Sequence, residues 1–163
     1  MKRILKWSTL VLVVGLLVGQ FVRPEKTNPP VDPTRTLEAR AQVPPEVQSI
    51  LQRSCKDCHS YLTRWPWYSH VAPTSWIVAS DVEEGREQWN MSDWARNDAR
   101  KADQILEEIC EEIEAGKMPL RSYTLAHRGT SLSDAEVKLL CDWTRAERQR
   151  LSAQPVPQQG HSR

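Results

Sequence analysis

Two cysteines and a histidine stand close together in the segment Cys55-Lys-Asp-Cys58-His59. This C-x-x-C-H spacing is the signature of covalent haem attachment, in which each thiol adds to one vinyl group of the porphyrin. The imidazole that follows the second thiol is then placed to bind the iron as its proximal ligand. The motif therefore predicts one covalently attached haem c per chain, held by Cys55 and Cys58, with His59 on the iron.

A haem iron that transfers electrons needs a second axial ligand from the protein. Met118 lies between one predicted helix and the last one, beside a proline that stiffens the loop. Its thioether opposite an imidazole would raise the reduction potential. Met118 is the favoured ligand, although it could instead fill the core. The alternatives are His70 and His127, and behind them Met91 and His161.

An aromatic stretch follows the motif in a chain that contains seven tryptophans. Trp and Tyr bury large apolar areas while keeping one hydrogen-bond donor, so they could wall a porphyrin or bind its propionates. Arginine could pair with the propionates through charge-assisted hydrogen bonds. An ordinary aromatic core is the alternative. The candidates are Arg64, Trp65, Trp67, Tyr68 and Arg86.

The remaining cysteines, Cys110 and Cys141, lie on the apolar sides of two predicted helices. If those faces pack together in an oxidising compartment, the sulfurs could form a disulfide. A disulfide is the favoured interpretation, and two buried free thiols are the alternative.

The N-terminus has the layout of an export signal, with basic residues ahead of an apolar run. Residues 1–22 are interpreted as a retained signal-anchor, which would cross the membrane with its basic end inside, rather than as a cleaved signal peptide. Repeated prolines over 23–43 favour an extended tether. Residues 44–149 form the predicted domain, and 150–163 are a polar tail predicted to be disordered.

Within the domain, apolar residues at helical spacing predict an all-α fold. Pro45 and Pro73 each begin a predicted helix, Gly85 is expected to weaken or end the second, and Ser133-Asp-Ala-Glu136 is a capping box. Residues 120–131 are expected to form a loop. The formal charge of +1 excludes the electrostatic footprint of a nucleic-acid-binding protein.

From about Val43 to Glu147 the chain resembles the bacterial haem-binding domain family, small anchored proteins of cytochrome c type. The resemblance implies haem c on Cys55 and Cys58, with His59 proximal and Met118 distal. The residues that match the family are the C-x-x-C-H motif with the following Ser60, the segments 63–69, 71–76, 80–86 and 132–136, Met118-Pro119 and His127.

These observations predict a cytochrome c-like helical domain built around a covalent haem. The expected function is one-electron transfer at the periplasmic face of the bacterial inner membrane, to redox partners there, rather than enzymatic catalysis. A haem-based sensor or peroxidase-like protein, with a labile sixth ligand, is the first alternative. A thiol–disulfide oxidoreductase is the second alternative, but it would normally have a βαβ pattern, and no strand alternation surrounds the two cysteines. A zinc module would need two further ligands at compact spacing, which the sequence lacks.

Overall fold

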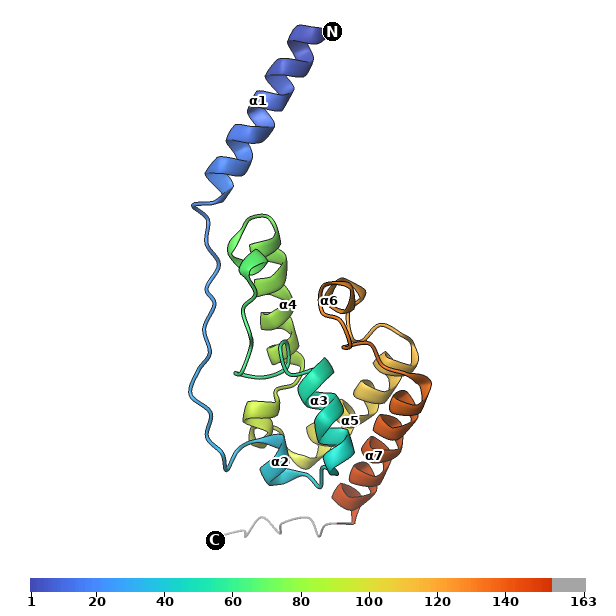
Figure 1. Ribbon diagram of the computed structural model, residues 1–163. Helices are drawn as coiled ribbons and strands as arrows, with labels where there is room; N and C mark the ends of the chain where they lie inside the picture. The colour runs from blue at the N-terminus through green and yellow to red at the C-terminus, as the bar shows by residue number, and fades with distance from the viewer. Residues whose placement is uncertain (154–163) are drawn as a thin grey trace.

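Seven α-helices and two 3₁₀-helices make up the computed structural model, which describes residues 1–153 (Figure 1). The described residues contain no β-strand, so the predicted all-α class is confirmed. The elements, in chain order, are α1 Lys2–Gly19, α2 Leu37–Arg40, α3 Pro45–Ser54, η1 Trp67–His70, α4 Thr74–Gln88, η2 Met91–Arg96, α5 Ala99–Glu114, α6 Arg121–Ala126 and α7 Asp134–Ser152.

The helices α5 and α7 pack against each other and contribute much of the apolar core. Ile105, Ile109 and Ile113 recur every four residues and are buried on one face of α5. The predicted capping box is present at the start of α7, where Ser133 accepts a hydrogen bond from the backbone N–H of Glu136 and donates its own backbone N–H in return. Local signals therefore start α7, and burial of an apolar face stabilises the pair.

A disulfide between Cys110 and Cys141 joins α5 to α7, which confirms the predicted pairing. Because the two cysteines are 31 residues apart in sequence, the bond restricts the unfolded chain. Replacing both with serine is expected to lower the free energy of unfolding by about 2–4 kcal/mol, measured by urea unfolding. Wild-type protein in reductant is the matched control and should lose as much. An unchanged unfolding midpoint in the variant would contradict this expectation.

Two short helices ahead of the C-x-x-C-H motif complete the core. Pro45 begins α3 as predicted, and Val47 and Leu51 on that helix are almost inaccessible to solvent. Leu37 on α2 is also fully buried, and α2 lies within the segment 23–43 that was predicted to be a tether. That part of the segment is therefore folded into the domain.

The helices α4 and α6 show where local sequence signals are incomplete. The helix predicted after Pro73 is present as α4, but it continues through Gly85 to Gln88. Gly85 was expected to weaken or end this helix, and the second of these expectations was wrong. The expected loop over 120–131 contains α6, which has no buried residue. A hydrogen bond from the hydroxyl of Tyr123 to Asp57 Oδ2, 2.9 Å long, ties α6 to the C-x-x-C-H motif.

The apolar N-terminal residues form α1, which projects away from the other helices (Figure 1). The helix itself agrees with the sequence-based expectation for 1–22. Among residues 1–153, however, no helix combines the length and the apolar character needed to cross a lipid bilayer.

The extended chain between α1 and α2 is held along the domain by polar side chains. Lys26 Nζ donates to the carbonyl oxygen of Ser69 at 2.7 Å, and Asn28 Nδ2 donates to that of Thr63 at 2.9 Å. Arg86, considered above as a propionate partner, donates to Asn28 Oδ1 at 3.0 Å and also to the hydroxyl of Thr63 at 3.0 Å. These bonds fix the direction in which the chain approaches the domain.

Candidate functional site

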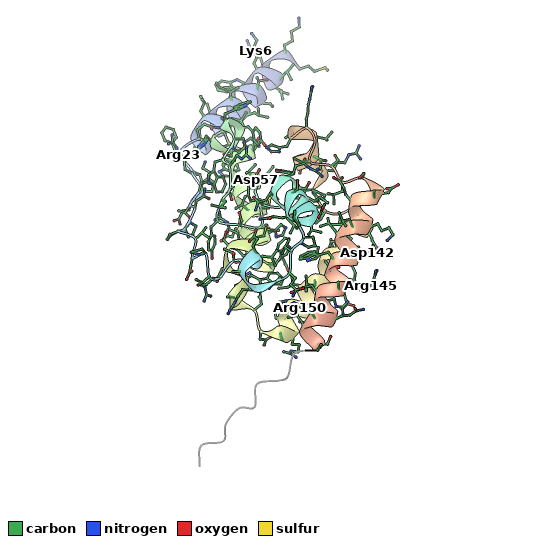
Figure 2. The ribbon with its side chains drawn as sticks, turned by 60° about the horizontal axis from the view of Figure 1, so that its bottom comes forward. Lys6, Arg23, Asp57, Asp142, Arg145 and Arg150 are labelled. Atoms are coloured by element: carbon green, nitrogen blue, oxygen red, sulfur yellow. A yellow bond between two sulfur atoms is a disulfide. The ribbon has the colours of Figure 1, made fainter. Side chains whose placement is uncertain are left out.

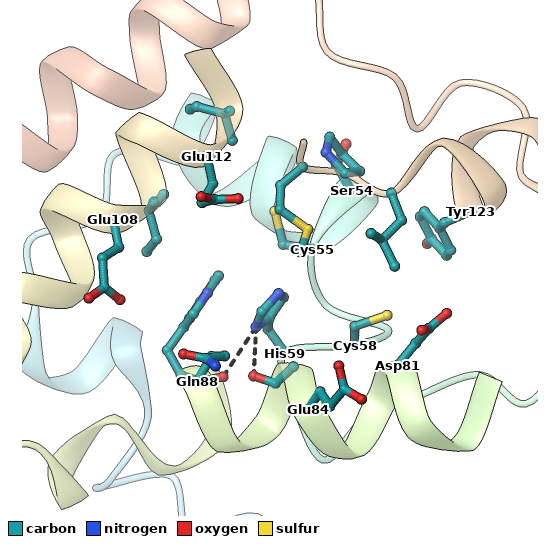
Figure 3. Close-up of a pocket in the computed structure, with 17 residues that line it drawn as sticks. Ser54, Cys55, Cys58, His59, Asp81, Glu84, Gln88, Glu108, Glu112 and Tyr123 are labelled. Carbon is teal, nitrogen blue, oxygen red and sulfur yellow. Dashed lines mark hydrogen bonds between the residues drawn. The ribbon is translucent and has the colours of Figure 1, made fainter. Parts of the chain in front are cut away.

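A cavity of about 510 Å³ lies where the C-x-x-C-H motif meets α4, α5 and the chain before α6 (Figure 3). Volumes of this order are typical of pockets that hold small molecules and cofactors. The structure brings the two thiols, the imidazole and the methionine predicted from the sequence into the wall of this one cavity. These residues are Cys55, Cys58, His59 and Met118.

The imidazole of His59 is held by backbone carbonyl groups of α4 and the residue after it. Its Nδ1 lies 2.8 Å from the carbonyl oxygen of Gly85 and 3.3 Å from that of Trp89 (Figure 3). Because a carbonyl oxygen only accepts, Nδ1 carries the proton and donates it. The ring of Trp89 stacks on the imidazole with centroids 4.3 Å apart. These contacts fix the ring and leave Nε2 for a ligand, as a metal-binding histidine requires.

Burial also sets the protonation state of His59, whose residue surface is only 8% exposed. Desolvation lowers the pKa of His59 from 6.5 to about 4, although the hydrogen bonds to Trp89 and Gly85 partly oppose it. The imidazole is therefore neutral near pH 7. A neutral imidazole with its proton on Nδ1 presents a lone pair on Nε2, which is the form that binds a metal ion.

Gly85 lets α4 approach the C-x-x-C-H motif closely, and this role was not foreseen from the sequence. A Cβ atom at this position would lie 2.9 Å from the carbonyl oxygen of Cys58 and 3.1 Å from its Cβ. Any larger residue would push α4 away from the motif. Since the carbonyl group of Gly85 also holds His59, this glycine combines close packing with positioning of the imidazole.

The thiols of Cys55 and Cys58 are not joined to each other. Burial, followed by the charge of the neighbouring Cys58, raises the pKa of Cys55 to about 12. Burial, followed by the carboxylates of Asp81 and Asp57, raises the pKa of Cys58 to about 11. Cysteines that act as nucleophiles in thiol–disulfide exchange have a lowered pKa. Both groups here are protonated thiols at neutral pH, which disfavours that chemistry.

Met118 reaches the cavity because the chain turns sharply after α5. Gly116 has φ +65°, in the left-handed region that glycine adopts without strain and that commonly ends a helix. The backbone N–H of Met118 then donates to the carbonyl oxygen of Glu112 at 3.2 Å. Met118 is half-buried against the apolar core and lines the cavity. Met118 therefore packs against the core and is also in the cavity wall, while its role as an iron ligand stays a prediction.

The other predicted site residues, Arg64, Trp65, Trp67 and Tyr68, are not among the residues that line the cavity. Arg64 is exposed, and Trp67 is 78% exposed. The hydroxyl of Tyr68 lies 3.1 Å from Nε2 of His127. The indole N–H of Trp65 is buried and has no hydrogen-bond partner within the described part of the chain. The structure thus does not bring these four side chains to the motif's cavity.

The alternative iron ligands also lie elsewhere. Both ring nitrogens of His127 make hydrogen bonds of 3.1 Å, to a tyrosine hydroxyl and to a backbone carbonyl. His70 is exposed in η1, and Met91 is buried in the apolar core. None of these three residues lines the cavity, and His161 lies outside the described residues.

Carboxylates from two helices also line the cavity (Figure 3). Asp81 and Glu84 belong to α4, and Glu108 and Glu112 belong to α5. Their negative charge favours the more positively charged state of any redox group that is held there. No lysine or arginine is found among the described residues that form this wall.

The residues present fit a haem group on chemical grounds. Two free thiols stand beside a neutral imidazole whose Nδ1 is already hydrogen-bonded. A thioether, that of Met118, is available in the same cavity. Thiols, imidazole and thioether are the groups that attach haem c and bind its iron.

Comparison with protein-family models finds a match to the haem-binding domain over residues 14–146, which is most of the chain. The matched range contains the C-x-x-C-H motif, Met118 and every helix that lines the cavity. Comparison with curated proteins and with solved structures finds no match. The chain therefore belongs to the haem-binding domain family, as its motifs suggested.

Proposed function

We propose that this haem-binding protein is a monohaem c-type cytochrome that carries one electron at a time. The observation that supports this most is that Cys55, Cys58, His59 and Met118 line a single cavity while both thiols are free. The two cysteines would form thioether bonds to one haem, and His59 and Met118 would be its two protein ligands. When bound, the haem supplies the change between ferrous and ferric iron.

The chain's own residues would keep the iron ligands in place during electron transfer. The carbonyl groups of Gly85 and Trp89 hold the His59 ring in one orientation, and the stacked indole of Trp89 prevents it from tilting. The disulfide on α5 holds the opposite wall of the cavity against α7. A rigid ligand set lowers the cost of changing the oxidation state and leaves no position for a substrate.

The main rival is a haem-based sensor or a peroxidase-like protein, which needs an open or weakly held iron position. Met118 in the cavity wall favours electron transfer over this rival. The thiol–disulfide oxidoreductase is disfavoured by the raised pKa values of Cys55 and Cys58 and by the absence of strands among residues 1–153.

Replacing Met118 with alanine is expected to open the sixth iron position. The oxidised variant should lose the long-wavelength sulfur–iron absorption band. The reduced variant should bind carbon monoxide at least about tenfold faster than wild type. His127→Ala is the matched control and should keep both the band and the slow binding. Rapid binding by the wild-type protein would favour the sensor, and an unchanged band in Met118→Ala would assign the ligand to another residue.

We also propose that the domain is exported and works beside the bacterial inner membrane, on its periplasmic side. The basic residues ahead of the apolar run in α1 support export. The disulfide between Cys110 and Cys141 supports an oxidising compartment. The redox partners would then be periplasmic or membrane proteins, with α1 keeping the domain near them.

A further inference from the structure

An apolar surface surrounds the place where α1 meets the domain. Four of its side chains are more than half exposed: Phe21 at 87%, Trp67 at 78%, Val22 at 63% and Ile77 at 57%. Two tryptophans belong to it, and tryptophan places an apolar ring beside a polar N–H group. We name this surface the junction patch, made up of Phe21, Val22, Trp67, Val71, Trp76 and Ile77.

The end of α1 is fixed to the junction patch. The side-chain amide of Gln20 accepts from the backbone N–H of Ala72 at 3.0 Å and donates to its carbonyl oxygen at 3.2 Å. The indole N–H of Trp76 donates to the carbonyl oxygen of Val22 at 2.8 Å. A Cβ atom on Gly19 would lie 3.1 Å from the ring of Trp76, so the helix and this ring are in close contact. Whatever surrounds α1 therefore also meets the patch.

The middle of α1 exposes apolar side chains on every side. Val11, Leu12, Val13 and Val14 are all exposed, and consecutive residues of a helix point to different faces. A protein partner would cover one face of this helix and leave the others in water, whereas lipid covers all of them. Basic residues mark the far end of the helix, where Figure 2 shows Lys6, and no acid lies within α1.

We infer that the junction patch contacts the surface of a lipid bilayer, so that the domain lies against the membrane in one orientation. Exposed tryptophans beside aliphatic side chains are typical of the membrane–water interface. Gly85, in the wall of the haem cavity, follows Ile77 by eight residues on α4 and so lies about 12 Å further along that helix. This inference goes beyond the proposed electron transfer and does not depend on how haem is attached.

Photo-crosslinking of the full chain in lipid nanodiscs tests the contact. The probe is a phospholipid with a diazirine near the top of its acyl chain, mixed into phosphatidylethanolamine and phosphatidylglycerol discs that hold one chain each. After trypsin digestion, the peptide 65–86 carries most of the patch, and the peptide 122–128 carries Leu125, which is 76% exposed on α6. We expect lipid adducts on 65–86 at a yield at least about fivefold above that on 122–128.

Two double variants make the test specific. Trp67→Ser/Ile77→Ser should reduce the adduct yield on 65–86 at least about threefold. Leu125→Ser/Leu139→Ser, which removes exposed leucines from α6 and α7, should leave that yield unchanged. Unaltered circular dichroism of both variants would show that they fold. Adducts confined to peptides of α1, or failure of the chain to associate with the discs, would overturn the inference.

Discussion

Replacing His59 with alanine is expected to reduce the yield of haem-loaded protein at least about tenfold. The imidazole is the neutral, fixed nitrogen ligand in the cavity, and the carbonyl groups of Gly85 and Trp89 are placed to orient it. Without it, a haem held by the two thiols would lack its proximal ligand. The yield is measured from the ratio of haem absorbance to protein in material exported together with a haem-attachment pathway.

A matched control for this variant is His70→Ala. His70 is exposed in η1 and does not line the cavity, so its removal should leave the haem yield unchanged. A normal yield and a wild-type spectrum for His59→Ala would mean that another residue binds the iron.

Replacing Gly85 with alanine is expected to lower the free energy of unfolding by about 1–3 kcal/mol. Alanine normally stabilises a helix relative to glycine by about 1 kcal/mol. A loss of stability at this position would therefore come from the packing of α4 and not from helix propensity. The added Cβ would approach the carbonyl oxygen of Cys58 to 2.9 Å and would force α4 away from the motif. That movement would also displace the carbonyl group that holds His59. We therefore expect a roughly tenfold loss in the yield of haem-loaded protein.

The control for the glycine change is Gly15→Ala on α1. No atom lies within 4 Å of a Cβ placed there, so neither the stability nor the yield of haem-loaded protein should fall. If Gly85→Ala were as stable as wild type and gave the same yield of haem-loaded protein, the close approach of α4 to the motif would not be needed for the site.

Several features of the site could be predicted because they are local in sequence. The spacing of Cys55, Cys58 and His59 carries the haem chemistry in five consecutive positions. The capping box of α7 and the proline of α3 are also local signals. Each helix begins at the residue that its signal predicts. Met118 was identified from its place between two helices, and the structure puts it in the cavity wall.

Features that depend on contacts between distant segments could not be predicted. Gly85 resembles a helix breaker in sequence, and only the packing of α4 on Cys58 shows why a glycine is needed. Trp67 was considered as a porphyrin wall, yet the fold leaves its side chain exposed, outside the cavity. α6 has no buried residue, and the hydrogen bond from Tyr123 to Asp57 that attaches it to the motif joins segments 66 residues apart.

The proline-rich chain between α1 and α2 also depends on contacts with distant residues that its composition does not predict. Its prolines correctly indicate extended backbone, but they contain no information about what that backbone contacts. Asn28 and Lys26 attach it to residues more than thirty positions later in the chain. Such bonds form only once the domain has folded, so composition alone suggests a free spacer.

Acid–acetone extraction of the purified wild-type protein tests covalent haem attachment most directly. Two thioether bonds, to Cys55 and Cys58, would survive denaturation by acid and solvent. We therefore expect the precipitated polypeptide to stay coloured, and its mass to exceed that of the bare chain by one haem. A colourless polypeptide of bare mass, with all haem in the acetone, would contradict covalent attachment and the cytochrome function proposed from it.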